Sequence, residues 1–193
     1  KELDFVSFDN YPEWHGTKEE EKVGIQTAFF HTLTRSLKKV PFLLMESAPS
    51  LVQWKPENVL KRPGMHELSS LQAIAHGSDS VQYFQWRKGR GGCEKYHGAV
   101  LDHKNGENTR VFRDVENLGK RLENISDQIK GTCNKPKVAI VLDWENWWAV
   151  EDAMAVRNHL NYIEICMKYY EPFWKMGIDV DLIDMEDSLE GYS

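Results

Sequence analysis

The chain has 193 residues, of which 41% are hydrophobic and 28% are charged, and its formal net charge is −6. This composition excludes an intrinsically disordered chain, and the lack of a basic block argues against a nucleic-acid-binding surface. No apolar run is long enough to span a membrane. The three cysteines, Cys93, Cys133 and Cys166, have neither zinc-site nor disulfide-framework spacing. We therefore predict a globular protein of a reducing, cytoplasmic compartment.

Strands and helices alternate through residues 1–130. Predicted strands lie at residues 3–8, 40–46 and 80–86, and predicted helices at residues 18–37, 65–76 and 108–128. Such alternation predicts βα units joined by right-handed crossovers in a parallel sheet. Three units cannot close an eight-stranded barrel, so a barrel would require about five further units before Lys1. We expect the chain to be a piece of a larger polypeptide.

The composition changes at residues 131–136, which we interpret as a linker. Residues 137–143 form the next predicted strand, and residues 144–148 a turn rich in aromatic and acidic side chains. A helix over residues 158–176 and a strand over residues 178–183 follow. This order predicts the start of a second α/β domain, of the flavodoxin-like or amidotransferase-like type, over residues 137–193.

A short apolar run over residues 40–45 ends at a carboxylate, Glu46. A wholly apolar run of this length, followed by small residues and proline, predicts a strand buried on both faces. In a barrel enzyme, the C-terminal ends of such strands carry the catalytic residues. Glu46 could instead be the first solvated residue after the strand, because charged side chains are normally exposed.

The ends of the three predicted strands bring a particular set of side chains to one edge of the sheet. Tyr11 follows the first strand, Glu46 and Trp54 the second, and Arg87, Glu94 and His97 the third. Aromatic faces stack on sugar rings, and charged groups bind sugar hydroxyls. A carboxylate beside the anomeric carbon can attack it or stabilise an oxocarbenium ion. This set therefore favours a sugar-binding site.

Three runs of the chain resemble one known family. They are FLLMESAPS at residues 42–50, YFQWR at 83–87 with RGGCEKYHGAV at 90–100, and VAIVLDWENWW at 138–148. The first two resemble the catalytic barrel of the glycoside hydrolase family 42 β-galactosidases. The third resembles the start of the trimerisation domain of that family. The resemblance covers nearly the whole chain in the order of the family.

The resemblance implies a retaining β-galactosidase with a (β/α)8 barrel, of which residues 1–130 would be the last three units. By position Glu46 would be the nucleophile, and its pKa should be held low by a donor such as Tyr11 or Arg87. Tyr11 would support or orient Glu46, and Arg87 could hold local charges in place. Trp54 would line the sugar subsite, and Glu94 and His97 would bind galactose hydroxyls. The acid/base residue would lie upstream of this chain. The resemblance further implies a homotrimer acting on β-galactosides, with no cofactor and no metal held by these residues.

Plainer interpretations stay open for several of these residues. Trp54 could pack its loop, Tyr11 could be a turn residue before Pro12, and His97 and Glu94 could be structural. The acidic residues near 143–152 could suggest a metal site, although an interface is the simpler reading. The segment after Pro136 could be an oligomerisation module without activity of its own, since its tryptophans and tyrosines suit an interface. A nucleotide-binding domain is disfavoured because no GxGxxG turn follows a strand.

Overall fold

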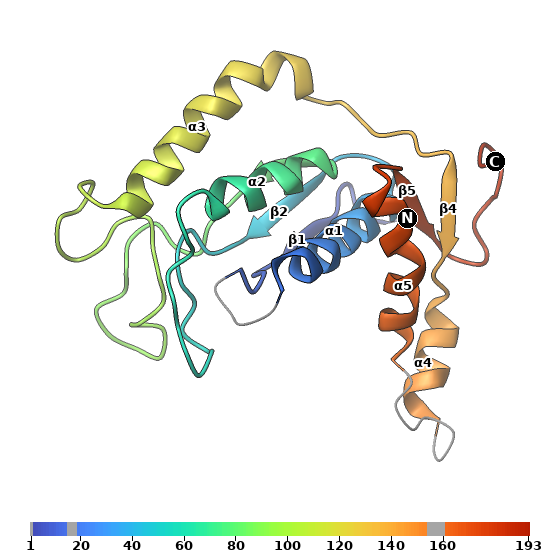
Figure 1. The fold of residues 1–193 in the computed structure, drawn as a ribbon, viewed down its shortest axis with the longest axis horizontal. Coiled ribbons are helices and arrows are strands. Elements are labelled where there is room, and N and C mark those ends of the chain that lie inside the picture. The colour runs from blue at the N-terminus through green and yellow to red at the C-terminus, as the bar shows by residue number, and fades with distance from the viewer. Residues whose placement is uncertain (1, 15–18, 154–160) are drawn as a thin grey trace.

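The computed structural model describes residues 2–14, 19–153 and 161–193 (Figure 1). Its first part is a parallel sheet of order β1-β2-β3 that alternates with helices. The elements in chain order are β1 (Ser7–Asp9), α1 (Glu20–Ser36), β2 (Phe42–Glu46), α2 (Met65–Ala75), β3 (Ser78–Val81) and α3 (Arg110–Ile129). The predicted strand–helix alternation over residues 1–130 is confirmed. In the view of Figure 1, α1 and α2 lie in front of the sheet.

One face of the central strand is sealed by the crossover helices. Phe42 and Leu44 are buried together with Ala73 of α2, while Leu43 and Met45 on the opposite face are only half-buried. The prediction of burial on both faces therefore holds for one face of the chain described here. The alternation itself follows from the strand repeat, which sends successive side chains to opposite faces.

Two strands are shorter than predicted. β1 covers residues 7–9 rather than 3–8, because the preceding residues, Leu3 and Phe5 among them, are exposed and outside the sheet. β3 covers residues 78–81 rather than 80–86. After Gln82, whose amide still bonds the carbonyl of Leu44, the chain turns so that the amide of Phe84 bonds Ser47 instead. Apolar composition alone predicted strand in both places, but a strand also needs a partner ladder.

The second part is built on two parallel strands, β4 (Val138–Val141) and β5 (Val180–Ile183), with helices α4 (Trp144–Asp152) and α5 (Tyr162–Lys175) between them. The turn predicted at residues 144–148 is wrong, since these residues begin α4. Asp143 explains the difference, because its side chain accepts a hydrogen bond from the amide of Asn146 and caps the helix. The first residues of the helix predicted at 158–176 lie outside the described ranges, and α5 begins at Tyr162.

The two parts share one apolar core although residues 131–136, which were predicted to be a linker, lie between them in sequence. Helix α1 contributes one side of this core, and α5 with β5 contribute the other. The buried members are Ile25, Ala28, Phe29, Leu142, Ile163, Cys166, Tyr170, Val180 and Leu182. The second part is therefore packed directly on a helix of the first, and the two are not joined by the linker alone.

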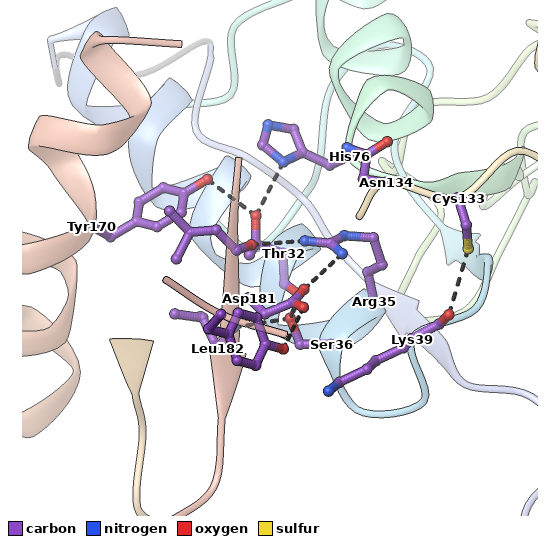
Figure 2. A network of polar contacts seen from close by, with 12 residues as sticks. Thr32, Arg35, Ser36, Lys39, His76, Cys133, Asn134, Tyr170, Asp181 and Leu182 are labelled. Carbon is purple, nitrogen blue, oxygen red and sulfur yellow. Dashed lines mark hydrogen bonds and ion pairs between the residues drawn. The ribbon is translucent and has the colours of Figure 1, made fainter. Parts of the chain in front are cut away.

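A buried ion pair crosses this junction (Figure 2). Nη1 of Arg35 on α1 donates to Oδ1 of Asp181 on β5 at 2.8 Å, and its Nη2 donates to the carbonyl oxygen of Val180 at 2.7 Å. The Ser36 hydroxyl donates to the same carboxylate, and the Tyr192 hydroxyl donates to Oδ2 at 2.7 Å. Both charged side chains are almost fully buried. Such a pair fixes geometry, because either charge alone would be strongly destabilising there.

A second polar chain in Figure 2 ties three helices together. The Thr32 hydroxyl lies 3.1 Å from Nδ1 of His76 at the end of α2, and 3.1 Å from the hydroxyl of Tyr170 on α5. Burial lowers the pKa of His76 to about 4, with a further contribution from the charge of Arg35. His76 is therefore neutral at pH 7 and can accept a hydrogen bond. Among the described residues, no helix is long and apolar enough to cross a membrane.

Candidate active site

Glu46 is the last residue of β2, so the strand register places its side chain at the C-terminal edge of the sheet. The carbonyl oxygen of Glu46 accepts a hydrogen bond from the amide of Asn10, at 2.9 Å, and that of Ser47 accepts one from the amide of Phe84, at 3.1 Å. The ends of all three strands are thus bonded to one another around Glu46. A backbone held from both sides gives its side chain a defined position, which a reacting group requires.

Tyr11 donates a hydrogen bond from its hydroxyl to Oε2 of Glu46 at 2.8 Å. Burial, followed by the hydrogen bond to Glu46 and the charges of Glu46, Asp9 and Glu94, raises the pKa of Tyr11 well above its ordinary value. The phenol consequently stays protonated and remains a donor over the working pH range. A hydrogen bond of this kind stabilises the ionised form of the carboxylate that accepts it. Among the described residues, Tyr11 is the only side chain that bonds the carboxylate of Glu46.

Aromatic rings surround this pair. Trp54 meets Tyr11 edge to face at a centroid distance of 4.9 Å and lies 5.2 Å from His97. The ring centroid of His97 lies 6.1 Å from that of Tyr11 and 5.0 Å from that of Phe84, both in edge-to-face geometry. Trp54 remains 51% exposed, whereas His97 is fully buried. The exposed indole leaves an apolar surface next to the carboxylate, which is the arrangement that stacking on a sugar ring requires.

His97 is positioned by backbone contacts on both sides. Its amide donates to the carbonyl oxygen of Glu94 at 2.9 Å, and its Nδ1 lies 2.9 Å from the carbonyl oxygen of Gly98. Because a carbonyl only accepts, Nδ1 carries a proton. Nε2 is buried and has no hydrogen-bond partner within the described ranges.

The structure brings Tyr11, Glu46, Trp54 and His97 together, and Glu94 lies at their margin. Glu94 is exposed, and its charge reaches Tyr11. Arg87 is less closely associated with the group. Its backbone pairs with Leu101, and its exposed side chain makes no hydrogen bond or ion pair with the residues that the structure describes. The same ranges contain no group of three or more His, Cys, Asp or Glu residues that could hold a metal ion.

Sequence reasoning missed two contributors to this region. Lys61 is buried and donates to the carbonyl oxygen of Ala48, two residues after Glu46. Gly98 contacts the loop that carries Trp54 so closely that an added Cβ would lie 2.1 Å from Oγ of Ser50. A lysine in a polar, proline-rich loop gives no sequence signal of burial. The glycine signal was available, since an isolated glycine can mark a close backbone approach.

Parallel βα units with a carboxylate, a phenol and an indole at the strand ends define an α/β protein that is consistent with part of a barrel. The family model described as β-galactosidase, glycoside hydrolase family 42, matches residues 1–125, and the model of the β-galactosidase trimerisation domain matches residues 136–193. The chain therefore belongs to glycoside hydrolase family 42. The resemblance found in the sequence is confirmed.

Relatives and solved structures agree with this assignment. The chain is 53% identical to the β-galactosidase Pbg of Clostridium perfringens over 192 residues, which cover 98% of this chain and 28% of that protein. The β-galactosidase BglY of Alicyclobacillus acidocaldarius is 50% identical over 191 residues, with the same coverage. The crystal structure of a β-galactosidase from Rahnella sp. R3 matches with a TM-score of 0.94 at 49% identity, again covering 98% of this chain and 28% of that one. The chain thus spans 28% of the length of these relatives.

Proposed function

We propose that this chain is part of a retaining β-galactosidase that hydrolyses terminal non-reducing β-D-galactosyl residues, and that Glu46 is its nucleophile. The hydrogen bond from Tyr11 to Glu46 is the observation that carries the proposal. It leaves an ionised carboxylate oriented at the end of a parallel strand, beside an exposed indole. Membership of the family, whose relatives are named β-galactosidases, supports the substrate class. We infer that β1 to α3 are the last three units of a (β/α)8 barrel.

In the proposed reaction, an acid from another part of the polypeptide protonates the leaving oxygen while Glu46 attacks the anomeric carbon. Water then resolves the glycosyl-enzyme, and the configuration is retained. Tyr11 holds the attacking carboxylate in position during the first step. Because its phenol stays protonated, Tyr11 can keep one hydrogen bond to the same oxygen before attack.

The remaining residues are assigned to substrate binding. Trp54 offers its exposed face to the apolar side of the galactose ring, and Nε2 of His97 accepts a hydrogen bond from one hydroxyl. Glu94, exposed at the margin, accepts from a second hydroxyl. For Arg87 a role in holding local charges stays a prediction that no contact in the structure carries.

Replacement of Glu46 by Gln in the intact enzyme tests the proposal. The amide cannot act as nucleophile, so we expect nearly all turnover of an aryl β-galactoside to disappear while thermal unfolding stays unchanged. The matched control is Glu57→Gln, in the same region but fully exposed. An Glu46→Gln enzyme that keeps more than about a tenth of the unaltered activity would overturn the assignment, because loss of a covalent nucleophile removes far more than that.

We further propose that the enzyme is a homotrimer located in the cytoplasm. The trimerisation-domain match supports the trimer, and the unpaired state of Cys93, Cys133 and Cys166 agrees with a reducing compartment. The second candidate function is an assembly module, favoured by the exposed aromatic residues Trp148 and Tyr169 at 62% and 65% exposure. Light scattering of the intact enzyme and of a Trp148→Ser, Tyr169→Ser variant checks this role. A trimer reduced to monomers by the variant supports it, and an unaffected trimer contradicts it.

A further inference from the structure

Three successive carbonyl oxygens follow the end of β2, and each accepts one hydrogen bond from a different part of the chain. The first two, of Glu46 and Ser47, accept from the backbone amides of Asn10 and Phe84. The third, of Ala48, accepts from Nζ of Lys61 at 2.5 Å. Lys61 is therefore the one side chain among these three donors. A substitution can remove its contribution without altering the ladder.

Lys61 is 4% exposed and, within residues 2–14, 19–153 and 161–193, forms no ion pair. Its backbone is fixed as well, because its carbonyl oxygen accepts a hydrogen bond from Nη2 of Arg110 at 2.7 Å. An ammonium group has three donors, and the carbonyl of Ala48 uses one of them. A buried charge with donors left over is strongly destabilising unless other polar groups solvate it. Burial accordingly lowers the pKa of Lys61 to about 8.

Lys61 lines a small cavity together with three residues, each of which has a buried nitrogen without a hydrogen-bond partner in the described part of the chain. These nitrogens are Nδ2 of Asn10, Nδ1 of His31 and Nδ1 of His66. The cavity, of about 10 Å³, lies behind the end of β2 and is also lined by Ser47 and Ala48. That volume is about the smallest that can hold one water molecule, and it is too small for a larger ligand.

The hydrogen-bonding capacities of these groups match a single water molecule. Lys61 and Asn10 can only donate from Nζ and Nδ2, so they require an acceptor. Burial lowers the pKa of His31 to about 3 and that of His66 to about 4, so both rings are neutral and can accept at Nδ1. Nε2 of His66 lies 3.0 Å from the hydroxyl of Tyr83, which leaves Nδ1 free to accept. A water accepts two hydrogen bonds and donates two.

We propose that this cavity binds one ordered water, which accepts from Lys61 and Asn10 and donates to His31 and His66, and that Lys61 with this water is a positioning element for Glu46. The water completes the solvation of the ammonium group, which can then hold the carbonyl of Ala48. Asn10 donates to the water from Nδ2 of its side chain and to the carbonyl oxygen of Glu46 from its backbone amide. The carbonyl of Ala48, two residues after Glu46, is thereby held in place. This inference rests on the proposed role of Glu46.

Replacing Lys61 by Met in the intact enzyme keeps the length and removes the donors. We expect kcat to fall between about tenfold and about 100-fold, since small displacements of a reacting group have effects of this size. KM should stay unchanged, because Trp54 and His97 still bind the sugar. Arg62→Met is the matched control, as the neighbouring side chain is 63% exposed. An unchanged kcat in the Lys61→Met enzyme, or an equal fall in the Arg62→Met enzyme, would overturn the inference.

A high-resolution crystal structure of the unaltered intact enzyme gives an independent answer, even if Lys61→Met fails to fold. Density for one water bonded to Nζ of Lys61 and to at least two of the three nitrogens supports the inference. Direct contacts among these groups, with no water between them, would contradict it. The Glu46→Gln enzyme separates the two proposals. If it is inactive while Lys61→Met is fully active, only the positioning role fails, whereas an active Glu46→Gln enzyme removes the proposed function itself.

Discussion

Two carboxylates on β-strands have opposite surroundings in this chain. Glu46, at the end of β2, is half-buried and receives one hydrogen bond, from Tyr11. Asp181, in β5, is 4% exposed and receives hydrogen bonds from Arg35, Ser36 and Tyr192. The second carboxylate accepts three hydrogen bonds from the protein and is too buried to meet a ligand. The first keeps most of its capacity for a ligand, as a group that acts on a substrate must.

The contrast shows how burial separates a structural charge from the carboxylate that we propose to be reactive. Both residues are acidic, and both follow or lie within short apolar strands, so the local sequence does not distinguish them. A saturated buried pair contributes fixed geometry. A carboxylate with a single protonated donor and open acceptor positions is poised for chemistry. Four substitutions or conditions test this difference, in order of expected effect.

The largest effect on stability is expected from Asp181→Asn in the intact enzyme. Removing one partner leaves Arg35 buried without compensation, which typically destabilises a protein by about 3–5 kcal/mol. The free energy of unfolding from urea titration measures the loss, while kcat per folded molecule should stay the same. Glu116→Gln, which breaks an exposed pair with Lys120, should lose at most about 1 kcal/mol. Equal stability of the two variants would show that the junction is not structural.

Tyr11→Phe should show the opposite pattern. The substitution removes the hydrogen bond to Glu46 but keeps the ring beside Trp54, so the loss appears in kcat rather than in stability. Hydrogen bonds to charged groups contribute about 1.5–3 kcal/mol, which corresponds to a fall of about 10- to 100-fold. Steady-state kinetics on an aryl galactoside measure it. Tyr96→Phe, at an exposed position, is the control, and indistinguishable kinetics for the two would exclude a role for the Tyr11 phenol.

Gly98→Ala should affect substrate binding through the loop that carries Trp54. An added Cβ would lie 2.6 Å from the carbonyl oxygen of Leu51, so the backbone has to shift, with a loss of about 1–3 kcal/mol. We expect KM to rise because Trp54 moves with the loop. Gly91→Ala is the matched control, since its Cβ would meet nothing within 4 Å. If KM were the same in both variants, the loop would not depend on this contact.

Acid should weaken both regions together, through histidines that are neutral when folded. Burial lowers the pKa of His31 to about 3, and those of His66 and His76 to about 4, from an ordinary value of 6.5. Between these values the unfolded chain binds protons that the folded chain does not. Stability is therefore complete above pH 6.5 and falls as the pH decreases, by at most ~1.4 kcal/mol per histidine per pH unit. Urea titrations at pH 7 and pH 5.5 measure this, and the His76→Gln enzyme should lose less than the unaltered enzyme.

Much of the fold followed from patterns in the sequence. The apolar run before Glu46 and the strand–helix alternation predicted the parallel sheet, and the aromatic and acidic residues after the strands predicted the site region. Sequence patterns predicted secondary structure less well where it depends on a hydrogen-bond partner elsewhere in the chain. Residues 3–6 and 82–86 have strand composition but make only isolated backbone hydrogen bonds rather than a continuous ladder, and residues 144–148 form a helix because Asp143 caps it.

Neither the ion pair between Arg35 and Asp181 nor the burial of Lys61 could be predicted from the sequence. Arg35 and Asp181 are 146 positions apart, and nothing near either residue indicates that the other lies opposite. Lys61 belongs to a residue type that is almost always exposed. That Tyr11, Glu46, Trp54 and His97 lie near one another could be predicted, because the loops that follow parallel strands lie at one edge of the sheet. The contact between Tyr11 and Glu46 needed the structure.

The most direct test of the central claim is covalent trapping of the nucleophile. A 2-deoxy-2-fluoro galactoside with a good leaving group slows the release of the glycosyl-enzyme, so the intermediate accumulates. The intact enzyme is treated, digested and examined by mass spectrometry. We predict that one fluorogalactosyl residue is attached to the peptide that carries Glu46, at that carboxylate. Attachment at another residue, or continued turnover without any labelled peptide, would contradict the assignment.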